Sequence, residues 1–148
     1  SGTAGAADFF EITGVQLEAN TQPTPFEQLP VGVELSLCQR YYSKSYNITD
    51  APGAVSSSGS AGAIVSTSYN PVAFCMTQFP VVMRAAPTVT IYNPFSGAVN
   101  TVNNTGVGTV SVSGAGRIGT AGFRFLDISG SGSGGNGYEF HWVATAEL

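Results

Sequence analysis

The fold is decided by the stretch Tyr138-Glu139-Phe140-His141-Trp142-Val143-Ala144-Thr145-Ala146-Glu147-Leu148. Aromatic and aliphatic residues occupy every second position from Tyr138 to Leu148, and most of the positions between them are polar. A period of two residues is typical of a β-strand that buries one face. The stretch therefore predicts a strand over 138–148, with Trp142 in the core. His141 is expected on the opposite face beside Glu139, exposed or held by a hydrogen bond.

Shorter segments with strand character precede this stretch. They are 62–69, 72–77, 88–92, 107–113 and 122–129. Val89 and Ile91 should face inward in 88–92, and Val110 and Val112 share one side of 107–113. For 122–129 the pattern leaves two alternatives open, with either Phe123 and Phe125 or Leu126 and Ile128 in the core.

The segments between these strands are rich in glycine, serine and asparagine. They cover 54–61, 94–104 and 130–137. Short strands at roughly ten-residue spacing, separated by such turns, are typical of sandwiches and jelly rolls. The sequence thus predicts an all-β domain, a β-sandwich of the jelly-roll type.

One short helix is expected near the start of this domain, over 33–42. Leu35, Cys38 and Tyr42 recur at spacings of three and four, and Leu37 and Tyr41 form a second apolar stripe. Such a segment makes about three turns. The pattern predicts a helix that packs in the core or against another subunit.

The first thirty residues have a different character. Residues 8–18 have strand character with apolar positions on both faces, and 19–30 carry Pro23, Pro25 and Pro30, which favour an extended linker. We expect residues 1–30 to be a strand and proline-rich linker from the preceding region of a longer protein. Residues 31–148 are expected to form the C-terminal β-sandwich domain.

Composition narrows the possible functions. Charged residues make up 9% of the 148 residues, against about 25% in an average domain, so much of the surface should be neutral or covered by a partner. The net charge is −4 and the five basic residues are scattered, which argues against nucleic-acid binding. No apolar run reaches the roughly 18 residues of a membrane span. Cys38 and Cys75 are expected to be buried, reduced thiols, although a disulfide between them stays possible.

Three separated blocks carry the strongest family signal. They are Leu37-Cys38-Gln39-Arg40-Tyr41-Tyr42, then Pro80-Val81-Val82-Met83-Arg84-Ala85-Ala86-Pro87-Thr88-Val89-Thr90-Ile91-Tyr92, then Ala144-Thr145-Ala146-Glu147-Leu148. In this order the blocks resemble the C-terminal domain of bacteriophage tail fibre and tailspike proteins. The resemblance implies a homotrimer in the virion tail, assembled in the host cytoplasm. It also implies recognition of a bacterial cell-surface polysaccharide or lipopolysaccharide, with no catalytic residues and no cofactor.

Loop aromatic residues are the candidate glycan contacts, because an aromatic ring packs well against the apolar face of a sugar. The candidate ligand-binding residues are Tyr46, Tyr69, Tyr92, Asn93 and Phe95. The loops expected to carry recognition are 43–62, 93–106 and 129–137, since binding residues concentrate on loops held by a rigid scaffold.

Catalytic and metal sites have little support in the sequence. Asp127 and Glu139 are the only carboxylates of the later strands before the terminal Glu147, and nothing brings them together as a glycosidase pair. Arg84 is expected to have a structural role. His141 is the only histidine, and a metal or anion held by three copies near a trimer axis is a secondary hypothesis.

The sequence is compatible with three functions. The first is a non-enzymatic receptor-binding tip domain that also contributes to trimerisation. The second is a purely structural cap that drives trimerisation of the fibre. The third, a polysaccharide-degrading domain, is disfavoured by the sparse carboxylates.

Overall fold

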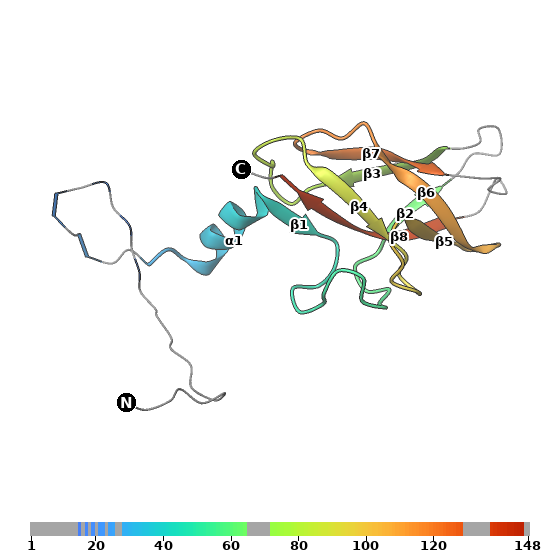
Figure 1. Ribbon diagram of the computed structural model, residues 1–148, viewed down its shortest axis with the longest axis horizontal. Coiled ribbons are helices and arrows are strands. Elements are labelled where there is room, and N and C mark those ends of the chain that lie inside the picture. The colour runs from blue at the N-terminus through green and yellow to red at the C-terminus, as the bar shows by residue number, and fades with distance from the viewer. Residues whose placement is uncertain are drawn as a thin grey trace, which may run out of the picture.

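The computed structural model describes residues 28–64, 72–128 and 137–146, together with positions 15, 17, 19, 21, 22, 24 and 25 (Figure 1). Helix α1 spans Val31–Gln39. The strands are β1 (Tyr42–Lys44), β2 (Ala61–Ile64), β3 (Val72–Gln78), β4 (Thr88–Tyr92), β5 (Thr101–Asn104), β6 (Gly108–Gly116), β7 (Gly122–Ile128) and β8 (Gly137–Thr145). The expected all-β class with one short helix is confirmed.

Strand β8 lies at the centre of the sheet. On one edge it pairs with β1 through Val143–Thr145 and with β2 through residues 137–140. On the other edge it pairs with β4 through residues 141–145 and with β5 through Tyr138 and Glu139. Each edge of β8 thus carries two short strands, end to end, interrupted by a loop.

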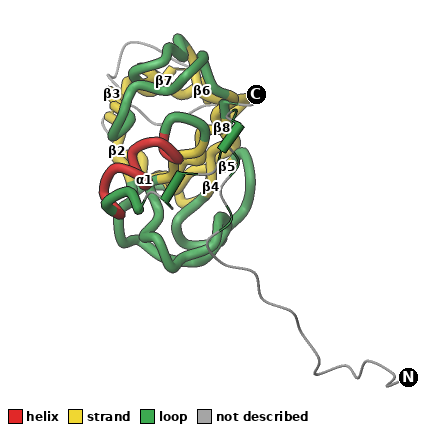
Figure 2. The backbone as a smooth tube through the Cα atoms, turned by 90° about the vertical axis from the view of Figure 1, so that its left-hand side faces the viewer, coloured by secondary structure: helices red, strands yellow, loops and turns green. Residues whose placement is uncertain are grey.

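The remaining strands complete a circuit. From β8 the pairings run through β2, β3, β7, β6 and β5 and return to β8, and every pair is antiparallel. Figures 1 and 2 place β3 and β7 along one side of the domain, away from β4, while β6 runs from β7 to β5 and contacts β4. In the end-on view of Figure 2, α1 stands in front of the strands.

The core fills the space that these strands enclose. Its fully buried side chains include Ile91, Val102, Leu126, Phe140 and Ala144. Trp142 is buried as expected, and its ring packs 5.3 Å from that of Phe79. The inward positions expected for β4 and β6 are confirmed, since Ile91 and Val112 are buried while Val89 and Val110 pack against the core.

The buried positions of β7 match neither of the two alternatives that the sequence leaves open, which place either Phe123 and Phe125 or Leu126 and Ile128 in the core. Phe123 from the first and Leu126 from the second are both buried. A register shift interrupts the β3–β7 ladder between Phe74 and Thr77, and another interrupts the β6–β7 ladder between Val112 and Gly114. In both shifts the extra residue lies on the partner strand, β3 or β6, so the irregular pairing surrounds β7 on both edges.

Several expected boundaries need correction. The helix ends at Gln39 rather than at residue 42, because Tyr42 pairs with Thr145 as the first residue of β1. The expected loop 94–104 contains strand β5, which is held between β6 and β8. The strands expected over 8–18 and 62–69, and the loop 130–137, fall largely outside the described residues.

Helix α1 also differs from expectation in its packing. None of its residues is buried, and Cys38 is exposed rather than buried. Cys75 is buried, and both cysteines are free thiols. The side chain of Arg84 is exposed and lies over the ring of Tyr41 at 5.3 Å, which agrees with its expected structural role.

Candidate functional site

The interruptions on the two edges of β8 occur at the same level. The loop between β1 and β2 leaves the sheet next to His141 and Trp142 of β8. The loop between β4 and β5 leaves the sheet next to Phe140 of β8. Loop 45–60 emerges from the first gap and loop 93–100 from the second, and they extend on the same side of the molecule in Figure 1. We call these two loops together the platform.

His141 supports the platform from beneath. Its side chain points away from the core residues Phe140 and Trp142, yet its exposed fraction is 0%. The sequence pattern placed this residue on the outer face of β8, where exposure or a hydrogen bond was expected. The structure adds complete burial, because loop 45–60 covers the ring.

The His141 ring is fixed on three sides. Its Nε2 lies 2.8 Å from the carbonyl oxygen of Ser56, and its Nδ1 lies 2.9 Å from the Oγ of Ser45. A carbonyl oxygen only accepts, so Nε2 donates to Ser56. The Ser45 hydroxyl is shared between Nδ1 and the carbonyl oxygen of Trp142, to which it can donate at 3.3 Å. The ring of Tyr46 stacks on the imidazole at 3.9 Å.

Ser45 ties this arrangement to the sheet. Its Oγ accepts the backbone N–H of Trp142 at 2.9 Å, and its own backbone N–H donates to the Trp142 carbonyl at 3.0 Å. The serine side chain thereby takes the place of a neighbouring strand at the gap between β1 and β2. This contact begins loop 45–60 in a fixed direction.

The two loops of the platform are bonded to each other. The backbone N–H of Ser56 donates to the carbonyl oxygen of Pro94 at 3.0 Å. Gly53 and Gly97 meet so closely that a Cβ on Gly97 would overlap the carbonyl oxygen of Gly53. Both glycines have positive φ, of 83° and 71°, which side-chain-bearing residues adopt with strain. The sequence thus lets two loops, remote in the chain, pack backbone against backbone.

Tyr46 and Tyr92 face each other within this assembly. Their ring centroids lie 6.1 Å apart in an edge-on arrangement, and the Tyr46 hydroxyl accepts the backbone N–H of Gly53 at 3.2 Å. Burial raises the pKa of Tyr46, the bond from Gly53 opposes this effect, and the neighbouring Tyr92 hydroxyl raises the pKa further. Tyr46 is buried, whereas Tyr92 is half-buried.

Asn93 shapes loop 93–100. Its Oδ1 accepts the backbone N–H groups of Phe95 at 2.8 Å and Ser96 at 3.2 Å, and its Nδ2 donates to the Thr109 hydroxyl at 3.3 Å. An asparagine that bonds the backbone two and three residues ahead stabilises a tight turn. Asn93 is fully buried, so it positions Phe95 and presents no polar group to solvent.

Apolar and polar side chains share the exposed surface of the platform, the polar ones being Asn47, Thr49, Ser57, Ser58, Ser96 and Asn100. Phe95 is 56% exposed, and Ile48, Val55 and Val99 are also large exposed hydrophobic residues. Asp50 is the one charged residue of the platform, and its carboxylate accepts from Asn47 Nδ2 at 3.2 Å and from the Thr49 hydroxyl at 3.5 Å. Lys44, the last residue of β1, donates from Nζ to the carbonyl oxygens of Ile48 and Asp50. The platform therefore presents aromatic, aliphatic and neutral polar groups with one carboxylate.

Four of the five sequence candidates meet in this region. Tyr46, Tyr92, Asn93 and Phe95 come together at the platform, where Phe95 is exposed and Tyr92 is half-buried. Tyr69 lies outside the described residues. Sequence reasoning missed the role of His141 as the support of both loops. The only available signal was that a single histidine interrupts an aromatic strand.

The described residues contain no group of three or more His, Cys, Asp or Glu side chains placed to hold a metal ion. Near His141, the closest described carboxylate on β8 is Glu139, whose Oε2 accepts from Asn103 Nδ2 at 3.4 Å. No helix among the described residues is long and apolar enough to cross a membrane. None of the protein-family models, curated proteins or solved structures compared with the chain matches it.

Proposed function

We propose that this chain is the non-enzymatic tip domain of a phage tail fibre or tailspike, and that its platform binds a bacterial cell-surface glycan. The observation that carries the proposal is the joining of loops 45–60 and 93–100 above His141. This joining holds Tyr92 and Phe95 in one surface supported by the sheet. Rigid support of exposed loop aromatics is what a recognition site requires.

The chemistry of the platform favours a carbohydrate. A half-buried tyrosine offers a ring and a hydroxyl, and the exposed Phe95 ring offers a flat apolar face. Sugars present C–H faces to aromatic rings and hydroxyls to polar groups, and such mixed surfaces match aromatic side chains. A bacterial polysaccharide or lipopolysaccharide is the partner of this kind that the sequence resemblance implies.

The same proposal includes a two-layered sandwich and a homotrimer in the virion. The Phe123 ring of β7 packs against Phe140 and Trp142 of β8, with centroids 6.3 Å and 6.2 Å apart, which supports two facing layers within the closed circuit of strands. Helix α1 supports self-association, because Val31, Val33, Leu35 and Leu37 are exposed and the helix buries no residue. On the helix these residues form two stripes, Val31 with Leu35 and Val33 with Leu37, so α1 exposes apolar side chains on more than one side. Exposed apolar surface of this extent is typical of an interaction site.

Adhesion to cells tests recognition directly. Labelled protein should adhere to a susceptible bacterial strain, and the double variant Tyr92→Ala/Phe95→Ala should lose at least tenfold in adhesion. Val107→Ala is the control, since Val107 is another exposed hydrophobic residue, in the turn between β5 and β6 and outside the platform. Equal adhesion of the wild type and the double variant would contradict the platform as the binding site.

A structural cap is the second candidate function, and the exposed apolar surface of α1 is the observation that favours it. A cap would associate through α1 and bind no glycan. Light scattering coupled to size exclusion should give a trimer for the wild type and a smaller species for Leu35→Ser/Leu37→Ser. A trimer that adheres to no bacterial surface would favour the cap over the receptor-binding tip.

A further inference from the structure

A second surface lies at the opposite end of the outer face of β8. Thr88, Thr145 and Tyr42 form a direct cross-strand row on β4, β8 and β1. Directly paired residues in antiparallel strands point to the same side of a sheet. Ser43 and Ala144 are buried on the inner side, so the row faces outward, where Thr88 and Tyr42 are exposed.

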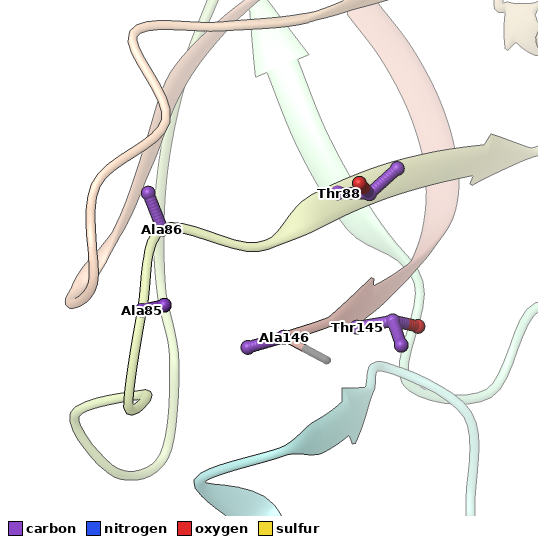
Figure 3. A pocket seen from close by; sticks show the side chains of 5 residues that line it. All are labelled: Ala85, Ala86, Thr88, Thr145 and Ala146. Carbon is purple, nitrogen blue, oxygen red and sulfur yellow. The ribbon is translucent and has the colours of Figure 1, made fainter. Parts of the chain in front are cut away.

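This row opens into a cavity. The cavity has a volume of about 420 Å³ and is lined by Ala85, Ala86, Thr88, Thr145 and Ala146. Figure 3 shows the two alanines of the loop before β4 on one side and the threonines of β4 and β8 on the other. Its volume falls within the range of roughly 300–1,000 Å³ that is usual for ligand pockets.

The described residues of the lining combine methyl groups with hydroxyls and carry no charge. A threonine hydroxyl both donates and accepts a hydrogen bond. Beside this lining, the ring of Tyr42 is 42% exposed and can pack against a flat ligand. A neutral, hydroxyl-rich ring is the ligand class that uses the methyl groups, the hydroxyls and the Tyr42 ring together, and the described lining residues favour it because none of them is charged.

The cavity and the platform lie on one continuous strip. Thr88, Thr90 and Tyr92 share the outer side of β4, and Tyr92 pairs with His141 beneath the platform. Tyr92 lies four positions after Thr88 on the strand, which corresponds to about 13–14 Å. Burial and then the neighbouring Tyr92 hydroxyl raise the pKa of Tyr42, which agrees with the two tyrosines sharing this side. The strip is longer than one sugar ring.

We propose that this strip binds a stretch of a neutral polysaccharide, with one sugar residue seated in the alanine–threonine cavity and the chain running over Thr90 to Tyr92. The inference rests on the proposed glycan-binding function and extends it. The platform alone would hold a short terminal epitope. The cavity adds a second contact about one strand-length away, so affinity should rise with the length of the glycan.

Two independent variants of the full chain test the cavity. Thr88→Val/Thr145→Val removes both hydroxyls and keeps their shape, and valine suits strand positions. Ala86→Trp fills the cavity from an exposed loop position. The matched control is Ser111→Ala, which removes an exposed hydroxyl from β6, outside the cavity lining.

The probes are neutral O-polysaccharides released by mild acid from the lipopolysaccharide of a panel of bacterial strains, with binding measured by titration calorimetry. Both cavity variants should lose at least tenfold in affinity for the polysaccharide that the wild type binds, and Ser111→Ala should bind like the wild type. Fragments of one or two sugar residues should bind only at the platform. The wild type and the cavity variants should therefore have equal affinity for these fragments.

The outcomes separate this inference from the proposed function. Full binding by both cavity variants, with loss in Tyr92→Ala/Phe95→Ala, overturns the strip and keeps the platform. Binding of no neutral polysaccharide by the wild type overturns the strip as well. An altered oligomeric mass in Ala86→Trp with unchanged glycan affinity would assign the cavity to a contact between copies and would likewise overturn the inference.

Discussion

At the scale of single residues, His141 links the sheet to the platform. The ring packs on Tyr46 and bonds to Ser45 and Ser56, all from one loop, and that loop bonds in turn to Pro94 of the other. The sequence indicated an outer-face residue next to Glu139. Full burial could not be predicted, since it depends on a loop that begins almost a hundred positions earlier.

Removing the imidazole should therefore weaken the whole domain. We expect His141→Ala to lower the free energy of unfolding by about 2–4 kcal/mol, because two buried hydrogen bonds and an aromatic stack are lost. His141→Phe should lose less, since it retains the stack on Tyr46. Urea denaturation measures both, with the exposed Phe95→Ala as the control. A loss below about 1 kcal/mol for His141→Ala would contradict the supporting role.

The close approach of Gly53 and Gly97 gives a second prediction at this scale. Gly97→Ala should destabilise the domain by about 1–2 kcal/mol more than Gly108→Ala. Both glycines have positive φ, but a Cβ on Gly108 meets nothing within 4 Å whereas one on Gly97 overlaps Gly53. The comparison isolates the contact between the loops from the backbone strain. Equal losses would show that the loops part easily.

Cys75 predicts how stability changes at alkaline pH. Burial raises the pKa of its thiol from 9.0 to about 11, against a smaller opposing effect of the hydrogen bond with Thr77. The folded pKa lies above the unfolded one, so this contribution to stability is complete below pH 9.0 and is lost as the pH rises through about 11. The raised pKa values of Tyr42 and Tyr46 act in the same direction at higher pH.

Urea denaturation at about pH 8 and at about pH 10.5 checks this expectation, and the urea midpoint should be lower at the higher pH. Cys75→Ala should show a smaller fall, because it removes the titrating thiol. Thiol labelling at the lower pH provides a separate check. The exposed Cys38 should react in the folded protein, and the buried Cys75 only after unfolding. An identical pH dependence in Cys75→Ala would contradict the role of this thiol.

At the scale of elements, short strands were the hardest to predict. The sequence predicts Tyr42 at the end of a helix, residues 43 and 44 at the start of loop 43–62, and Thr101–Asn104 in a loop, whereas the structure has strands β1 and β5 there. Each is only three or four residues long and becomes a strand because β8 offers it an edge. Longer segments such as Thr88–Tyr92 carry enough alternating residues to be recognised without their partners.

Helix α1 should contribute little to the stability of its own domain. Because the helix buries none of its residues, Leu35→Ser/Leu37→Ser should leave the free energy of unfolding of the dissociated domain, measured by urea denaturation, unchanged within about 0.5 kcal/mol. Measurements at low protein concentration separate this result from any effect of association. A clear loss of stability would mean that α1 packs on its own domain.

At the scale of the whole molecule, β8 is the strand that pairs with the largest number of other strands. It pairs with β1, β2, β4 and β5, and Tyr138, Phe140 and Trp142 bring large buried rings into the core. Local opening of β8 would break pairings on both of its edges. Opening of this strand therefore requires the domain to unfold.

Hydrogen exchange should reflect this arrangement. We expect the amides of 140–145 to exchange most slowly, at the rate set by global unfolding, and those of α1 to exchange much faster. Mass spectrometry of peptic fragments resolves the two segments. Comparable protection of α1 and β8 in dilute, dissociated protein would contradict the central position of β8.

The sequence by itself determined the all-β class, the core positions of Trp142 and Ile91, the position of Tyr92 at the end of a strand and that of Phe95 in the loop that follows, because alternation and turn residues are local properties of the chain. Only the tertiary structure decided that His141 is buried, that loops 45–60 and 93–100 form one platform, and that α1 stays exposed within a single chain. These features depend on contacts between segments far apart in sequence. The physical reason is that a strand's second face is buried or exposed according to what packs on it, and its own residues do not fix that.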